Sequence, residues 1–320
     1  MRRLEWILLF LLVVSTGLLA MLPWWVMNPA RPQTQSDIDL AFALRGGWNT
    51  VFSFTAFAGG AMLCLWRWLV GRGLEKLVAV LALFLIGLCA AVANINMIGE
   101  VFQPIFAKEY APPAEAKFLT DSDFLLTFES GGTTRAYPLR LLGYHHLVED
   151  EVGAAPLLAT YDAFTRSAIV WKPELDGQPL QFTLTGIENQ NFLMRDEQTG
   201  SWWRQATGEC VAGSLRGRRL EPLPSEVVSL AILTRETPDA EVLKPADGSV
   251  LLPSDPELPR QGLPAPQAEG PLEPLELVVG VTAGGSAKAF PAESIREDAP
   301  LRATVGGREV AIVREGGAFR

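Results

Sequence analysis

Residue types that could carry out chemistry are scarce in this 320-residue chain, and most of them lie between positions 145 and 210. The two histidines of the chain are adjacent, at His145 and His146. Neighbouring residues point about 100° apart on a helix and to opposite sides of a strand, so one metal ion would seldom bind both. We expect one histidine to be functional or structural and the other to be exposed.

Cys210 is the one thiol outside the long apolar runs that hold Cys64 and Cys89. Without a partner nearby it is either packed in a core or serves as a metal ligand or reactive thiolate. A soft mixed site would suit copper or zinc, although the spacing does not require one. Its candidate ligands are His145, Asp162 and Cys210, with Met194 as a fourth.

Two polar and aromatic clusters, Asn189–Asn191 and Thr199–Trp203, surround tight turns. Tryptophan beside asparagine and glutamine could line a groove for a small molecule or a glycan, or could instead plug an aromatic core. Asp162 and Glu209 are the carboxylate pair that a hydrolase of cell-envelope material would need. The sequence holds no Gly-rich phosphate loop, nucleophile elbow, metalloprotease pair or CxxC motif.

The elements that precede these residues are three long apolar runs. Trp6–Val26 contains no charge, which is enough for a helix across a hydrocarbon core about 30 Å thick. Its start resembles a signal peptide, but the run is long and no Ala-x-Ala site follows, so we favour a retained helix. We predict a membrane region over residues 1–106, with helices at about 6–26, 51–70 and 77–98, the last two forming an antiparallel hairpin.

Basic residues in the short loops predict the orientation of these helices. Arg31 and Arg45 lie in the loop on one side, and five basic residues lie on the other. Those five are Arg2, Arg3, Arg67, Arg72 and Lys76. The side with five should be cytoplasmic, which places the chain after about residue 106 in the periplasm or outside a bacterium. Glu100, near the outer end of the third span, is expected at headgroup depth.

Charge is distributed unevenly between the two parts of the chain. Residues 1–106 hold 7 basic and 5 acidic residues (net +2), whereas residues 107–320 hold 20 and 31 (net −11), which sums to −9. This pattern excludes a single soluble domain, a disordered acidic chain and a nucleic-acid binder with a basic face. Three cysteines are too few for a fold built on disulfides.

Short segments separated by turn residues follow Pro112-Pro113 and indicate a mainly β, α+β domain over residues 107–244. The predicted strands are 124–128, 134–137, 157–161, 168–171 and 180–185. The predicted helices are 138–148 and 225–235. Residues 245–274 contain eight prolines, which favours an extended linker or a wrapped arm.

An internal repeat follows this Pro-rich stretch. Gly131–Pro138 matches Gly284–Pro291 at a constant offset of 153, and the offset holds to Val152-Gly153 and Val305-Gly306. Such a constant offset predicts two copies of one unit, with residues 275–320 as a truncated second copy that packs on the first. The second copy has no equivalents of the two histidines.

These residues resemble a bacterial domain-of-unknown-function family, number 3179. The matching positions cover most of 124–320: Arg135–Leu142, Tyr144–Asp150, Val152-Gly153 with Pro156, Asn189–Asp196, Thr199, Ser201, Trp203, Thr207–Glu209, Gly213, Pro238-Asp239 and the second Ala-Phe-Pro. Typical members read Trp-His-Glu at Tyr144–His146, and Thr-Tyr-Cys-Pro-Leu-Cys at Thr160–Thr165. The resemblance implies a metal or thiol–disulfide site in those relatives, whose two cysteines this chain lacks.

Three functions follow from these observations. The leading hypothesis is a non-catalytic binding or assembly domain anchored in the membrane, with the lipid bilayer and another envelope protein as partners. The second is a metal-binding or redox domain that uses copper or zinc. The third is a hydrolase acting on envelope material. The candidate binding residues are His145, His146, Asp162, Asn191, Met194, Trp203, Glu209 and Cys210.

Overall fold

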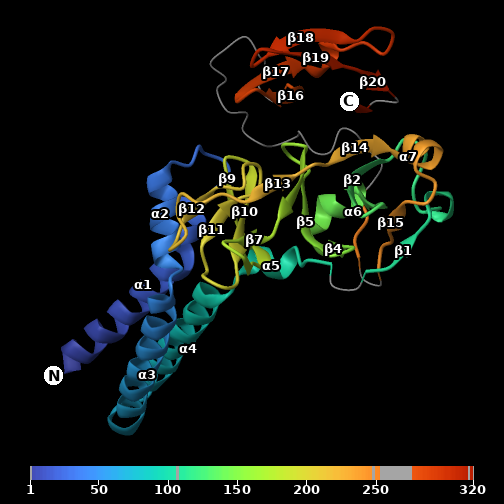
Figure 1. Ribbon diagram of the computed structural model, residues 1–320. Helices are drawn as coiled ribbons and strands as arrows, with labels where there is room; N and C mark the ends of the chain where they lie inside the picture. Colours follow the sequence, from blue (N-terminus) through green and yellow to red (C-terminus); the bar gives the residue numbers. More distant parts are fainter. Residues whose placement is uncertain (1, 106–107, 247–248, 253–275, 316–317, 320) are drawn as a thin grey trace.

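The structure is a computed structural model that describes residues 2–105, 108–246, 249–252, 276–315 and 318–319. Three parts follow one another along the chain: a helical bundle, a β domain (residues 110–243) and a C-terminal unit (residues 276–319) (Figure 1). The prediction of apolar helices followed by a mainly β domain is confirmed.

Three helices are long and apolar enough to cross a membrane: α1 (Arg2–Val26), α3 (Gly47–Val70) and α4 (Leu74–Asn94). Each contributes one residue, Leu9, Ala56 or Ile86, to a shared core. The prediction that the third helix reaches residue 98 was wrong. Asn94 hydrogen-bonds Thr50 and Ser53 of α3, and the chain then turns into the short helix α5 (Met97–Val101).

Arg67 lies between the helices at the end of the bundle far from the β domain and is only 1% exposed. It pairs with Glu5 of α1 at 3.1 Å and with Glu75 of α4, so one cation joins three helices. Such pairing removes most of the cost of a buried charge.

The β domain contains three sheets of four or five strands, and in the first of them the spatial order of the strands differs from their order in the sequence. The first is β1 (Tyr110–Ala111), β15 (Glu241–Leu243), β3 (Thr133–Pro138), β2 (Phe124–Ser130) and β14 (Glu226–Ser229). The second is β13 (Glu221–Leu223), β6 (Ser167–Lys172), β5 (Ala155–Asp162) and β4 (Leu147–Val152). The third is β12 (Cys210–Ala212), β11 (Trp202–Arg204), β10 (Asn191–Asp196) and β9 (Phe182–Glu188).

These sheets are stacked, because alternate residues of a strand enter different apolar cores. In β5, Leu157 faces the core shared with the first sheet, whereas Leu158 faces the core shared with the third. In β10, Met194 faces inward and Leu193 packs against α1 and α2 (Gln35–Leu44). The third sheet is therefore the layer nearest the membrane helices.

Short helices complete the β domain. The predicted helix at 138–148 is present as α6 (Leu139–His145), but the helix expected over 225–235 was wrong in its first part. Residues 226–229 pair with β2 as β14, and α7 (Leu230–Glu236) begins only after Ser229, whose hydroxyl accepts a hydrogen bond from Ile232 N–H. The one-turn helix η1 (Pro113–Glu115) packs beside α7, and β7 (Glu174–Leu175) and β8 (Gln178–Pro179) form the hairpin at Asp176-Gly177.

The C-terminal unit consists of β16 (Val278–Ala283), β17 (Ser286–Pro291), η2 (Ala292–Ser294), β18 (Leu301–Val305), β19 (Arg308–Ile312), β20 (Arg314–Glu315) and β21 (Ala318–Phe319). Its strands pair with one another, and among the described residues none pairs with the β domain. β17 begins and ends 153 residues after β3, but the internal repeat stays a prediction. The Pro-rich stretch 245–274 lies largely outside the described residues.

Candidate functional site

His145 ends α6 and uses both ring nitrogens within the fold. Its Nδ1 lies 2.8 Å from the carbonyl of Gln103, and Val250 N–H donates to its Nε2 at 3.3 Å. Because a carbonyl only accepts, Nδ1 carries the proton in this arrangement. His145 therefore ties the segment after the bundle and the segment before the Pro-rich stretch to the β domain.

His146 faces different surroundings from its neighbour. Its Nδ1 lies 3.0 Å from the Tyr161 carbonyl, and its ring packs against Phe192 at a centroid distance of 3.9 Å. Burial lowers the pKa of His146 to about 4, so the ring is neutral near pH 7. Its φ of +61° is a left-handed conformation that few residues other than glycine adopt.

Asp162 ends β5 and is completely buried. Its Oδ1 accepts from Phe164 N–H at 2.8 Å, and its Oδ2 accepts from Asn191 Nδ2 at 2.9 Å. Further bonds come from the backbone N–H groups of Thr165 and Phe192. Burial raises the pKa of Asp162, and these hydrogen bonds oppose the rise.

Asp162 belongs to a group of polar side chains that we call the Asp162 cluster: buried Thr160, Asp162 and Gln205, with half-buried Asn191. Gln205 donates to Thr160 Oγ1 at 3.0 Å, and its Oε1 accepts from Asn191 Nδ2 at 3.2 Å. Gln205 could not be predicted from the sequence, because only the pairing of β9, β10 and β11 brings it to β5. The cluster is satisfied internally, as a buried polar network must be.

Cys210, Trp203 and Met194 lie in a different place, in the apolar core between the second and third sheets. Cys210 is opposite Trp203 on neighbouring strands, and its sulfur donates to the Ala212 carbonyl at 3.4 Å. Burial raises the pKa of the Cys210 thiol to about 12, so it stays protonated at neutral pH. Trp203 Nε1 donates to buried Asp196 at 2.8 Å, a partner that the sequence analysis did not single out.

Glu209 is half-buried at the end of the third sheet. It pairs with Arg204 at 3.1 Å and with Arg219 at 3.7 Å, while Arg204 also binds Glu188 at 2.8 Å. Glu209 and Asp162 thus belong to separate hydrogen-bonded groups, and each already has its partners.

The predicted ligand residues are divided among these surroundings. Asp162 and Asn191 are in contact, and Met194, Trp203 and Cys210 share a core, whereas His145 contacts Gln103 and Val250. Among the described residues, no group of three or more His, Cys, Asp and Glu side chains is arranged to hold a metal ion.

Comparison with known proteins identifies the family of this chain. Residues 96–319 match the family described as protein of unknown function (DUF3179). The chain belongs to this family. None of the curated proteins and none of the solved structures matches it. The DUF3179 region begins just after α4 and includes the β domain and the C-terminal unit.

The DUF3179 domain is joined to the helical bundle by hydrogen bonds to the segment between α1 and α3 and to the residues just after α4. Asn189, in the tight turn between β9 and β10, accepts from Gln33 N–H at 2.8 Å and donates to the Gln33 carbonyl at 3.1 Å. Arg45 donates to the Thr185 carbonyl at 2.9 Å. Asn96, just before α5, donates to the Leu184 carbonyl at 2.6 Å.

An apolar contact accompanies these hydrogen bonds. Ile38 and Ala41 of α2 are buried against Trp202, and the ring of Phe42 meets Trp202 edge-on at 5.4 Å. The sequence analysis predicted no helix here, although Thr34 and Asp37 form a capping box that marks its start. We call this contact region, from α2 and its flanking loops to β9–β12, the junction.

Two grooves open on the surface of this DUF3179 domain. One, of about 410 Å³, lies at the junction between Phe42, Asp39 and Arg216. The other, of about 440 Å³, lies between β2, β14 and α7, and we call it the β14 groove. Phe128, Val228, Ile232 and Leu233 give it apolar walls, and its acidic lining residues are Glu129, Glu226 and Glu236.

Proposed function

We propose that this DUF3179 protein holds its β domain at the outer face of the bacterial cytoplasmic membrane, where the domain binds or assembles with another envelope protein and catalyses no reaction itself. The observation that carries the proposal is the junction. A domain linked only by a flexible tether would need no such contact, whereas a domain that presents a surface at a fixed height gains from one.

The state of the candidate reactive groups supports a binding role. Asp162 accepts four hydrogen bonds, both ring nitrogens of His145 have partners, and the Cys210 thiol is buried and protonated. A general base or nucleophile needs an accessible atom beside its substrate. In the residues that the structure describes, these groups instead stabilise the fold.

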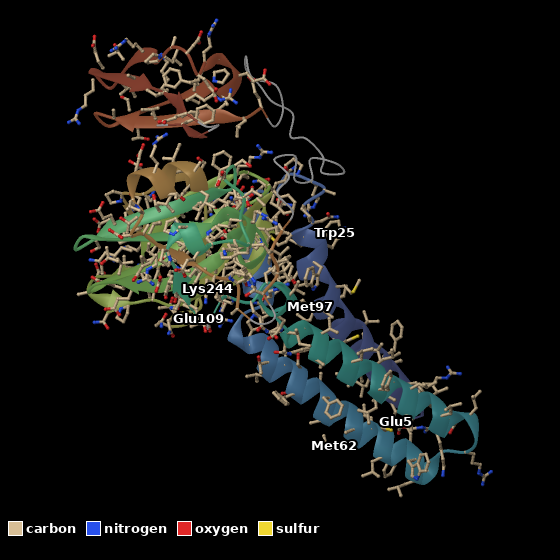
Figure 2. All side chains as sticks on the ribbon, turned by 90° about the vertical axis from the view of Figure 1, so that its right-hand side faces the viewer. Glu5, Trp25, Met62, Met97, Glu109 and Lys244 are labelled. Carbon is tan, nitrogen blue, oxygen red and sulfur yellow. The ribbon has the colours of Figure 1, made fainter. Side chains whose placement is uncertain are left out.

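The proposed orientation of the protein in the membrane rests on the charges of the short loops. Placing Arg2, Arg3 and the Arg72–Lys76 turn in the cytoplasm follows the positive-inside rule and puts the β domain outside. The uncharged lipid-facing side chains of α1, α3 and α4 fit this arrangement, since many large apolar residues there are exposed. In Figure 2, Glu5 and Met62 lie near the end of the bundle away from the domain, whereas Trp25 and Met97 lie close to the domain.

We place the partner contact in the β14 groove. The groove mixes apolar and polar side chains, its acidic residues give it a negative charge, and β21 lies beside its strand β14. A partner segment that carries apolar and basic side chains would match these features, because complementary charge sets the choice of partner.

In-cell photo-cross-linking tests this proposal. A benzoylphenylalanine at Glu129, in the groove, should give one discrete protein adduct, and the same probe at Glu151, an exposed acid on β4, should not. Reversing the charge at the groove with Glu226→Lys should remove the adduct. Equal cross-linking from both positions, or none from Glu129, would contradict the proposed contact.

Metal analysis separates this proposal from the metal-binding alternative. The purified full-length protein should contain no stoichiometric copper or zinc, and a chelator should leave its unfolding temperature unchanged. A structural metal site would couple metal binding to folding, so loss of stability on chelation would overturn the non-catalytic assignment in favour of a metal domain.

A further inference from the structure

Two arginines stack on tryptophans at the domain end of the bundle, but only one of them has an acidic partner. The Arg31 guanidinium lies 4.9 Å from the ring of Trp25, and it pairs with Asp37 at 3.1 Å. The Arg45 guanidinium lies 5.3 Å from the ring of Trp24. Among the described residues no carboxylate pairs with Arg45.

Arg45 is therefore a cation whose charge is not compensated within the described chain. Nη1 donates to the Thr185 carbonyl, which is its one side-chain hydrogen bond to the described residues, whereas a guanidinium has five N–H donors. Burial lowers the pKa of Arg45, which reflects the cost of keeping the charge there without an anion. An external anion at the free donors would remove that cost.

The surroundings of Arg45 indicate where such an anion would come from. Arg45 lies between α2 and α3, two residues before α3 begins. Trp24 is in the last turn of α1, which ends at Val26. Trp24 is 36% exposed, Trp25 65% and Trp48 49%. Tryptophans at the ends of membrane helices lie at headgroup depth, which is also the depth of lipid phosphates.

Arg45 also occupies a fixed position, as a binding residue should. Thr185 is the extra residue of a β-bulge in β9, because Leu193 pairs with Gly186 and Met194 pairs with Leu184. The bulge leaves the Thr185 carbonyl to accept from Arg45, and the neighbouring Leu184 carbonyl accepts from Asn96. The stem of Arg45 is thus held between the bundle and the β domain.

We propose that Arg45, together with Trp24, binds the phosphate group of a phospholipid in the leaflet nearest the β domain. Arginine suits this role because its planar fork of N–H groups matches phosphate oxygens and it stacks on aromatic rings. The lipid then becomes part of the junction, since the same guanidinium holds β9. The proposal does not depend on which side of the membrane the domain occupies.

Native mass spectrometry of the full-length protein in maltoside micelles tests this proposal. Titration with phosphatidylglycerol should give a first binding step that Arg45→Gln weakens about tenfold, the cost of losing a charge-assisted contact. Arg45→Lys should retain most of the affinity. Arg31→Gln is the matched control, because it removes an equal charge from a similar Trp-stacked position, and it should bind the first lipid like the wild type.

The source of the anion is decided in the same titration. A galactolipid without phosphate should not occupy the first site, and inorganic phosphate should not displace phosphatidylglycerol from it. Four results would each overturn the proposal. Two concern the variants: Arg45→Gln binds the first lipid as tightly as the wild type, or Arg31→Gln loses as much affinity as Arg45→Gln. Two concern the ligand: the galactolipid binds tightly to the first site, or inorganic phosphate displaces phosphatidylglycerol from it. If Arg45→Gln does not fold, the two lipids on the wild-type protein still decide the outcome.

Discussion

Two of the hairpins built on Gly-Gly turns, β2–β3 and β16–β17, have similar local sequences and different surroundings. β2–β3 has β14 on one side and β15 on the other, and apolar cores cover both of its faces. β16–β17 has no further strand among the described residues, and four of the six residues of β17 are exposed. The comparison shows that turn residues suffice to form a hairpin, whereas neighbouring strands and cores determine how stable it is.

Their packing against the following hairpin differs as well. A Cβ at Gly131 or Gly153 would meet no atom within 4 Å. At Gly284 and Gly306, the positions 153 residues further on, a Cβ would collide with the backbone of the other turn. In the C-terminal unit the two turns therefore touch, beside a core of few buried residues.

Replacing the core aromatic of each hairpin should have the largest effect. Tyr137 is fully buried and donates to Asp150 at 2.7 Å, so Tyr137→Ala should lower the free energy of unfolding of the β domain by about 3–5 kcal/mol. Phe290→Ala, its counterpart at the offset of 153, should cost about 3 kcal/mol and unfold only the C-terminal unit.

Hydrogen exchange resolved by segment would measure both effects on the full-length protein. Tyr137→Phe is the control, because it keeps the volume and loses one hydrogen bond, which costs about 1 kcal/mol. Loss of protection in β4–β6 after Phe290→Ala would show that the two parts unfold together and would contradict their separation.

The glycine turns give a sharper comparison. Gly131 and Gly284 have φ values of +60° and +55°, so alanine is strained at both by about 1–2 kcal/mol. Gly284→Ala must also displace the Gly306 carbonyl, and we expect a total cost of about 3 kcal/mol. Thermal unfolding of the two parts would measure this, and equal costs for Gly131→Ala and Gly284→Ala would disprove the contact between the turns.

The stability of the β domain should depend on pH through His146, whereas that of the C-terminal unit should not. The pKa of His146 is about 4 in the fold against an ordinary value of 6.5, so the unfolded chain binds more protons between these values. The stabilising contribution is complete above pH 6.5 and is lost as the pH falls toward 4, by about 3 kcal/mol. Residues 276–319 contain no histidine and should not show this loss.

Urea unfolding of the β domain at several pH values would measure the effect of His146. Burial raises the pKa values of Asp162 and Glu149, and this stabilises the fold as the pH falls, so the wild-type curve combines opposite contributions. His146→Asn isolates the histidine, since asparagine tolerates positive φ. A variant whose pH dependence equals that of the wild type would show that His146 is not buried as described.

These comparisons also show what the sequence could predict. The hairpins, the apolar helices and α6 depend on turn residues and hydrophobic runs that act over a few positions, and they were predicted. The Asp162 cluster joins residues as distant as Thr160 and Gln205, and Arg67 meets Glu5 across 62 positions, so no local pattern encodes either contact. The Thr34–Asp37 capping box was a local signal for α2 that could have been used.

The smallest effect concerns the contact between the two parts. Arg235 of α7 pairs with Glu315 at 2.6 Å, but the side chains are 61% and 42% exposed, so the pair should contribute less than about 1 kcal/mol. Glu315→Gln should leave both unfolding transitions unchanged and should broaden the distance distribution between spin labels on the β domain and the C-terminal unit. High salt should have the same effect on the wild type, because it screens exposed charges.

Glu293→Gln, on the same unit without an ion pair among the described residues, is the matched control. An equally narrow distribution in Glu315→Gln would show that β21, which lies beside β14, holds the unit in place without the ion pair.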